Sequence, residues 1–201
     1  AAFKIAVLDP LTTLTQPAHV TAATGIDAIS HAVESYVTPE RNPLSMDYSR
    51  EAWRLLSENF PRVFADPGDV EARAGMQKGA SLAGLAIEAS MLGAAHSAAN
   101  PLTAQYGIVH GVAIGLVLPA VVRFNSSKVG AEYDKLTGAE GGHGEGLASS
   151  LEKFRELSGL PKTLSAFKVR LEDIKNLSSD AESQWTARFN PVKVTAGDFQ
   201  A

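Results

Sequence analysis

One aspartate and three histidines are spaced so that a fold joining them must bring three separated segments of the chain together. Asp27 and His31 are four residues apart, whereas His96 and His110 lie in the part richest in glycine, alanine and histidine. Residues at i and i+4 share one face of a helix, which lets Asp27 and His31 bind one ion together. A proline and a glycine separate His96 from His110, so two further elements must converge on that helix.

The same residues also admit a purely structural interpretation. Asp27 follows Thr24 by three positions, as in a capping box at a helix start, and His96 among alanines is typical of a hydrogen-bonded core histidine. The combination of one carboxylate with three imidazoles, among small residues that let backbones approach closely, favours a divalent ion. We expect His19 to be an ordinary helix histidine, and His143, inside a glycine-rich loop, to be solvated.

Composition excludes several classes of partner. The chain has 201 residues, 45% hydrophobic and 20% charged, which is enough to bury one sizeable core. Its net charge is −4 and its 18 Lys and Arg residues are scattered, so we expect no binding to nucleic acid or to a membrane surface. The longest apolar run, 112–122, is shorter than the ~20 residues of a membrane span, and no signal peptide is visible. The absence of cysteine excludes thiolate sites and fits a cytoplasmic protein.

Periodicity predicts an almost entirely helical chain. The segment 3–8 is strand-like, and we expect residues 1–16 to form a strand and loop remnant, followed by a helical domain over 17–201. The glycine-rich segment 138–146 is interpreted as a mobile surface loop. The expected helices cover 17–37 (or a shorter stretch from Thr24), a segment capped by Ser45, 70–92, two shorter pieces that carry His96 and His110 and extend to 124, 147–157, and 179–187.

Several segments resemble the iron-containing (group III) alcohol dehydrogenases. They are 9–12 (Asp-Pro-Leu-Thr), 24–36 (Thr-Gly-Ile-Asp-Ala-Ile-Ser-His-Ala-Val-Glu-Ser-Tyr), 92–96 (Leu-Gly-Ala-Ala-His), 106–111 (Tyr-Gly-Ile-Val-His-Gly), 118–119 (Leu-Pro) and 184–191 (Gln-Trp-Thr-Ala-Arg-Phe-Asn-Pro). The resemblance covers only the C-terminal helical half of that family, whose fold is shared with dehydroquinate synthase. It implies an all-α helical bundle with a short N-terminal strand remnant. It also implies four metal ligands, Asp27, His31, His96 and His110, for Fe²⁺ or for Zn²⁺ as purified.

The resemblance further implies an activity that needs a second domain. In the family an N-terminal domain binds NAD or NADP, and this chain has no strand followed by a glycine-rich turn and helix for a pyrophosphate. The implied reaction interconverts a small alcohol and its aldehyde by hydride transfer, with the metal as Lewis acid. We therefore expect the chain alone to be inactive, and to self-associate as a homo-oligomer through apolar surface left by the missing cofactor domain. The alternative is a free-standing, non-catalytic helical module that binds a metal or a partner.

One position departs from the family pattern. Many members have a second histidine four residues after the third ligand, near the nicotinamide, where this chain has Asn100. Asparagine cannot titrate, but it can hold a water or orient a hydroxyl, so we take Asn100 as a catalytic candidate. The structural alternative is a helix-end residue before Pro101.

Overall fold

The computed structural model describes residues 5–139 and 141–200, and within these ranges the chain is built of helices and contains no strand. The all-α prediction is therefore confirmed. The helices are α1 (Ala18–Val37), α2 (Pro43–Ala65), α3 (Val70–Ala89), α4 (Ala94–Tyr106), α5 (His110–Thr137), α6 (Glu145–Leu157) and α7 (Ile174–Ser183), with short 3₁₀ turns that include η1 (Pro10–Thr13) and η4 (Trp185–Phe189).

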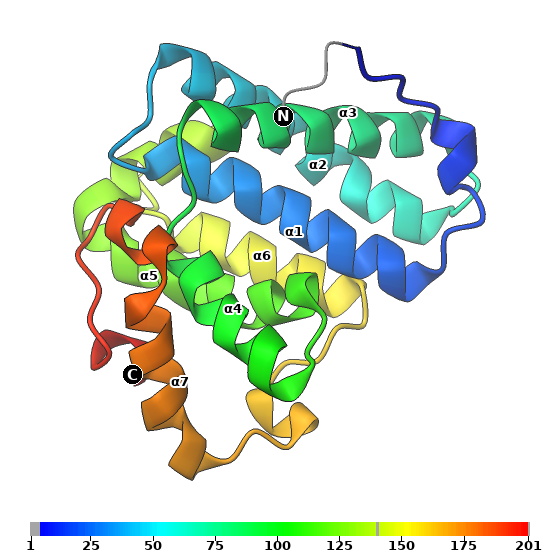
Figure 1. Ribbon diagram of the computed structural model, residues 1–201. Coiled ribbons are helices and arrows are strands. Elements are labelled where there is room, and N and C mark those ends of the chain that lie inside the picture. Colours follow the sequence, from blue (N-terminus) through cyan, green and yellow to red (C-terminus); the bar gives the residue numbers. More distant parts are fainter. Residues whose placement is uncertain (1–4, 140, 201) are drawn as a thin grey trace.

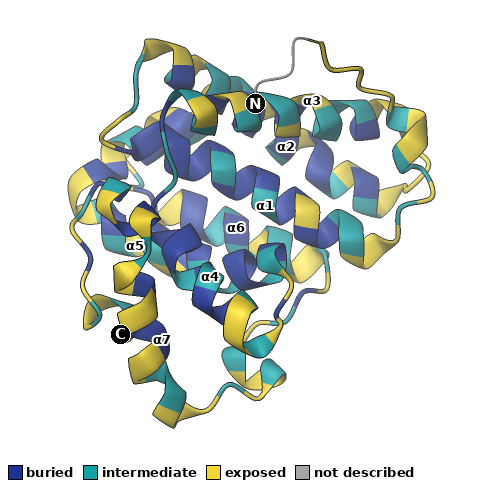
Figure 2. Ribbon diagram, viewed as in Figure 1, coloured by how far each residue is buried: buried dark blue, intermediate teal, exposed yellow. Residues whose placement is uncertain are grey.

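Helix α1 is the centre of the bundle. It contacts α2, α3, α5 and α6, and Figure 1 shows it running through the middle of the molecule. Most of its residues are buried, as Figure 2 shows by the dark band along the helix. Its apolar side chains at Ile26, Ile29 and Val33 recur at the helical spacing and are at most 2% exposed. Polar residues on the buried face of this helix therefore lie next to the core.

The helix starts follow from capping chemistry, with one correction. α1 begins directly after Pro17, which confirms the longer of the two predicted helices. The predicted cap Ser45 is wrong, because the cap of α2 is Asn42, whose side chain accepts the Ser45 N–H at 3.1 Å. The Ser45 hydroxyl in turn accepts the Asn42 N–H at 3.0 Å, which makes Ser45 the third residue of a capping box. Asp69 caps α3 by accepting the N–H of Ala72 at 2.9 Å.

Two separate helices carry the last two predicted ligands. α4 ends at Gly107, whose φ of 65° is the left-handed conformation that glycine adopts without strain, and α5 starts three residues later. α5 continues past the predicted end at 124, with a break in helical geometry at Val129. Among the described residues it is the one helix that passes a test of length and apolar character for a membrane span, and nearly half of its apolar stretch is buried in the fold.

The predicted N-terminal strand is wrong for the part that can be judged. Residues 5–9 are not in a strand, and Phe3 lies outside the described residues. The side chains of Ile5 and Val7 are 83% and 87% exposed. A strand needs a neighbouring strand for its backbone hydrogen bonds, and the described residues offer none. The alternating apolar pattern alone therefore did not determine the conformation.

The C-terminal part differs from prediction in its boundaries. The carboxylate of Asp134 accepts the N–H groups of His143 at 2.9 Å and Gly144 at 3.0 Å, which ties the end of the glycine-rich loop to α5 and lets α6 begin at Glu145. The helix predicted over 179–187 is wrong in extent. α7 starts at Ile174 and ends at Ser183, and a 3₁₀ turn follows from Trp185.

Candidate metal centre

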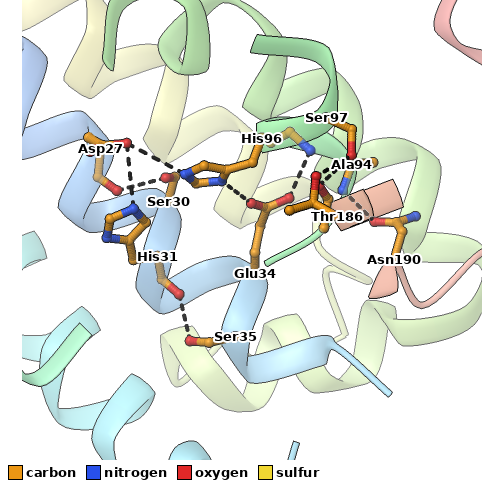
Figure 3. Close-up of polar contacts among 12 residues, drawn as sticks. Asp27, Ser30, His31, Glu34, Ser35, Ala94, His96, Ser97, Thr186 and Asn190 are labelled. Carbon is orange, nitrogen blue, oxygen red and sulfur yellow. Dashed lines mark hydrogen bonds and ion pairs between the residues drawn. The ribbon is translucent and has the colours of Figure 1, made fainter. Parts of the chain in front are cut away.

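The structure brings all four predicted ligands around one oxygen atom. The Nε2 atoms of His31, His96 and His110 each lie 3.6 Å from Oδ1 of Asp27. Asp27 and His31 come from one face of α1, His96 from the first turn of α4, and His110 is the first residue of α5. Asp27, His96 and His110 each offer a ligand atom within 4.8 Å of the other two, whereas His31 lies outside this set of three and joins the cluster through its 3.6 Å approach to Asp27. Figure 3 shows the Asp27, His31 and His96 side chains turned toward one another.

Glycines allow the three helices to approach this closely. A Cβ atom added at Gly111 would lie 1.9 Å from the carbonyl oxygen of Ala23, so α1 and α5 touch backbone to backbone beside His110. A Cβ at Gly93, just before α4, would lie 3.1 Å from a carboxylate oxygen of Glu34. The small residues that surround the ligands in the sequence are therefore required by the packing that joins them.

Glu34 is a buried carboxylate that orients His96. One oxygen lies 2.5 Å from Nδ1 of His96, and the other accepts the N–H of Ala95 at 2.7 Å (Figure 3). Because the Glu34 carboxylate accepts a hydrogen bond from Nδ1–H of His96, the Nε2 atom of His96 is turned toward Asp27. Such a carboxylate–histidine pair is the usual support behind a metal-binding imidazole. We did not single out Glu34 from the sequence, although it lies seven residues after Asp27 and so shares its helix face.

The charges of the cluster shift its pKa values in opposite directions. Burial disfavours the charged form of His96, but Glu34 and Asp27 outweigh burial and raise the pKa of His96 to about 9. Burial lowers the pKa of His31 and of His110, and the attraction of Asp27 offsets only part of that effect. Burial raises the pKa of Asp27, but His96 and the other histidines outweigh it and hold that pKa below its ordinary value. The ionised Asp27 and the neutral His31 and His110 are in the state that a cation needs, whereas His96 must give up the proton on Nε2 when a cation binds.

Two atoms of the cluster favour a metal ion over a simple ion pair. Oδ1 of Asp27 and Nε2 of His96 are buried, and neither has a hydrogen-bond partner among the described residues. A buried polar atom without a partner lowers the stability of the fold. We therefore expect a ligand that contacts both atoms to lie between them. Ligand atoms about 2.1 Å from a tetrahedral ion lie about 3.4 Å from one another. The 3.6 Å spacing around Asp27 is close to that value, so the residues present fit a divalent ion.

The cluster is closed on one side and open on the other. The His96 side chain is 6% exposed, whereas Asp27 is 29% and His110 is 34% exposed. A catalytic metal site keeps one position free for water or substrate, in contrast to a structural site whose ligands surround the ion. With four protein side chains around the ion, the open side of this cluster leaves room for a fifth ligand. His19 and His143 are both exposed, as expected for histidines outside the cluster.

Asn100 is held by a residue far away in the sequence. It lies four residues after His96 on α4, and its Nδ2 donates to Oε1 of Gln184 at 3.1 Å. Gln184 is itself bound through Nε2 to the carbonyl of Asp180, at 3.4 Å. This chain of contacts fixes the amide of Asn100 and leaves its carbonyl oxygen as an acceptor. No local pattern in the sequence pointed to Gln184, because the contact joins residues 84 positions apart.

The C-terminal segment supports the start of α4 through a buried polar network. Oδ1 of Asn190 accepts the N–H of Ala94 at 3.2 Å, and the amides of Asn190 and Asn125 bind each other at 2.7 and 3.0 Å. The hydroxyls of Ser97 and Thr186 lie 2.8 Å apart (Figure 3). The segment that follows α7 therefore fixes the turn of helix from which His96 projects.

Comparisons with known proteins show which family and fold the chain resembles. Residues 21–201 match the family described as "Fe-containing alcohol dehydrogenase family, C-terminal". The chain is 34% identical to long-chain-alcohol dehydrogenase 1 of Geobacillus thermodenitrificans over 98% of this chain and 52% of that protein. It is 29% identical to the NAD-dependent methanol dehydrogenase of Bacillus methanolicus over 97% of this chain and 54% of that protein. A crystal structure of 1,3-propanediol oxidoreductase superposes with a TM-score of 0.90 and 30% identity, covering 96% of this chain and 53% of that one.

Proposed function

The chain belongs to the iron-containing alcohol dehydrogenase family, and we propose that it is the metal-binding half of an NAD(P)-dependent alcohol dehydrogenase or aldehyde reductase. It spans about half the length of the curated relatives it matches. The proposal assigns NAD or NADP to the other half, because the described residues contain no strand that could begin a dinucleotide-binding unit. One relative named above is NAD-dependent by its name.

The observation that carries the proposal is the convergence of three imidazole Nε2 atoms on one buried oxygen of Asp27. We assign Asp27, His31, His96 and His110 as the ligands of Fe²⁺, or of Zn²⁺ in protein purified with it. Nitrogen and oxygen donors accept both ions, and affinity order alone does not select iron. Glu34 keeps His96 in the tautomer whose Nε2 is free to bind.

The proposed chemistry depends on the exposed side of the metal cluster, which the four ligand side chains leave accessible. A bound divalent ion supplies Lewis acidity, which lowers the pKa of an alcohol or polarises a carbonyl. The exposed side of the cluster admits the substrate oxygen, and the carbonyl of Asn100, fixed by Gln184, accepts a hydrogen bond from a hydroxyl or a water beside it. Asn100 carries no titrating proton, so it orients the reacting group, and proton movement passes through water.

A small alcohol or aldehyde is the proposed substrate. The relatives named above act, by their names, on long-chain alcohols, methanol and 1,3-propanediol, which share a hydroxyl or carbonyl carbon and differ in chain length. Chain-length preference depends on the walls of the substrate cleft. In the proposed enzyme those walls include the half that holds the nicotinamide.

An activity assay tests the proposal. The 201-residue chain and a longer version carrying the upstream half are loaded with metal without oxygen and assayed with NADH or NADPH and short aldehydes. We expect turnover only from the longer protein, because the chain alone has no positioned hydride donor. In the longer protein His110→Ala should abolish turnover, and His19→Ala, an exposed histidine of α1, should leave it intact. Equal rates from both lengths, or an active His110→Ala protein, would contradict the proposal.

A further inference from the structure

A second candidate site lies between α1, α3 and the η1 turn, where a few polar side chains stand within a largely apolar lining. It is a cavity of about 130 Å³. One wall is a helical stripe of α1 that includes Thr21, the opposite wall is a stripe of α3 that includes Arg73 and Gln77, and Thr13 and Gln16 close it from the η1 side. One water occupies about 30 Å³ of liquid volume, so the cavity has room for several water-sized groups.

Arg73 brings a buried positive charge to this cavity. The residue is 4% exposed. Its guanidinium makes one hydrogen bond to a described residue, from Nε to the carbonyl of Pro67 at 2.6 Å, and no described carboxylate forms an ion pair with it. Asp69, four residues earlier on the same helix, is already engaged by Arg62 and by the N–H of Ala72. Buried charges are normally paired, so the remaining donors of Arg73 call for an anion.

Two oxygen atoms in the cavity wall lack partners as well. Oε1 of Gln77 and Oγ1 of Thr21 are buried, and neither forms a hydrogen bond within the described part of the chain. The amide of Gln77 is fixed in orientation, because its Nε2 donates to the carbonyl of Asp9 at 3.1 Å. Oε1 of Gln77 therefore remains an acceptor in need of a donor. The occupant must offer negative oxygens to Arg73 and an O–H group either to Gln77 on the same wall or to Thr21 on the opposite wall.

We propose that this cavity, hereafter the Arg73 cavity, binds a small oxyanion that carries a hydroxyl, of which hydrogen phosphate is the simplest. The planar fork of a guanidinium matches two oxygens of a phosphate. The P–OH group of hydrogen phosphate donates to Gln77 or Thr21, which sulfate at neutral pH cannot do. The site is separate from the histidine cluster and does not depend on the proposed enzymatic function.

Thermal unfolding of the metal-free chain measures this binding. Inorganic phosphate is titrated against sulfate and chloride at constant ionic strength, after treatment with a chelator. We expect phosphate to raise the Tm by about 3–5 °C for each tenfold increase above saturation, because a ligand that binds only the folded state stabilises it by mass action. Sulfate should act more weakly and chloride not at all. Equal effects of phosphate and sulfate would overturn the assignment of a hydroxyl-bearing ligand.

Variants locate the effect. Arg73→Met should abolish the phosphate-dependent rise in Tm, and Arg50→Met, which removes an exposed arginine, should retain it. A phosphate effect that survives in a folded Arg73→Met protein would refute the site, and would point to the protonated histidines instead. If Arg73→Met does not fold, Thr21→Val serves in its place, and it should weaken phosphate binding without removing it.

A crystal soaked in arsenate gives the direct observation. Hydrogen arsenate is a tetrahedral oxyanion that keeps an O–H group near neutral pH, as hydrogen phosphate does, and its arsenic is located by anomalous scattering. We expect an anomalous peak beside the guanidinium of Arg73. An empty cavity, or a carboxylate from elsewhere in a longer version of the chain seated on Arg73, would overturn the proposal.

Discussion

Helix α1 borders two polar sites that differ in how their charges are compensated. In the histidine cluster every buried charge has neighbours of opposite character, since Glu34 binds His96 and three imidazoles surround Asp27. In the Arg73 cavity the buried guanidinium donates to one carbonyl and forms no ion pair with a described carboxylate. Both sites contain buried polar atoms without hydrogen-bond partners. Ligand atoms that can accept a cation converge in the histidine cluster, whereas the Arg73 cavity holds a cationic guanidinium. The comparison teaches that the sign of the uncompensated charge, more than the burial, indicates which class of ligand is missing.

The largest effect should come from separating α1 and α5. Gly111→Ala places a Cβ against the Ala23 carbonyl, and backbone atoms cannot move aside as a side chain can. We expect a loss of about 3 kcal/mol in the free energy of unfolding, together with loss of metal binding, because His110 moves away from Asp27. Urea unfolding and metal titration measure both quantities.

Gly84→Ala is the matched control for this substitution. No atom lies within 4 Å of a Cβ added there, in the middle of α3. Alanine favours the helix over glycine, so the control should gain about 1 kcal/mol. If Gly111→Ala behaved like Gly84→Ala, close contact of α1 and α5 would not be what assembles the cluster.

An effect of medium size on metal affinity should follow from changing Glu34, the carboxylate that orients the ligand His96. Glu34→Gln keeps the acceptor for the Ala95 N–H but offers a donor to Nδ1 of His96, which forces the proton onto Nε2. Metal affinity should fall about 10- to 100-fold. Glu58→Gln, an exposed carboxylate of α2 paired with Arg54, is the control and should leave affinity unchanged. Equal metal affinity in the Glu34→Gln and control proteins would show that His96 needs no orienting carboxylate.

The smallest effect should come from the Arg73 cavity in buffer without oxyanions. Arg73→Met removes a buried charge that has no acidic partner, and such replacements are often neutral or stabilising. We expect the free energy of unfolding to change by at most about 1 kcal/mol, measured in phosphate-free and sulfate-free buffer. A loss of several kcal/mol there would mean that the guanidinium is already compensated inside the fold, and the contrast between the two sites would fail.

The sequence predicted those features that depend on spacing along one helix or on a helix break. The position of Asp27 and His31 on one face followed from a spacing of four, and the division between α4 and α5 followed from Gly107. Strand formation at 5–8 was predicted wrongly, because a strand depends on a partner strand that no local pattern reveals.

The remaining parts of the site are tertiary contacts. Gln184 reaches Asn100 and Asn190 reaches Ala94 across more than 80 residues, and neither contact leaves a periodic trace in the sequence. Arg73 also escaped notice, because an arginine on a helix is ordinarily solvated and its burial here comes from tertiary packing around α3. Glu34 was the one supporting residue with a local signal, through its position on the Asp27 face.

Metal stoichiometry tests the central claim most directly. The chain and its His31→Ala, His110→Ala and His19→Ala variants are loaded with Fe²⁺ or Zn²⁺, freed of excess metal and subjected to elemental analysis. The account predicts about one ion per chain in the parent protein and in His19→Ala, and sharply lower content in the other two, because each loses one of four converging ligands. Undiminished metal content in both His31→Ala and His110→Ala would contradict it.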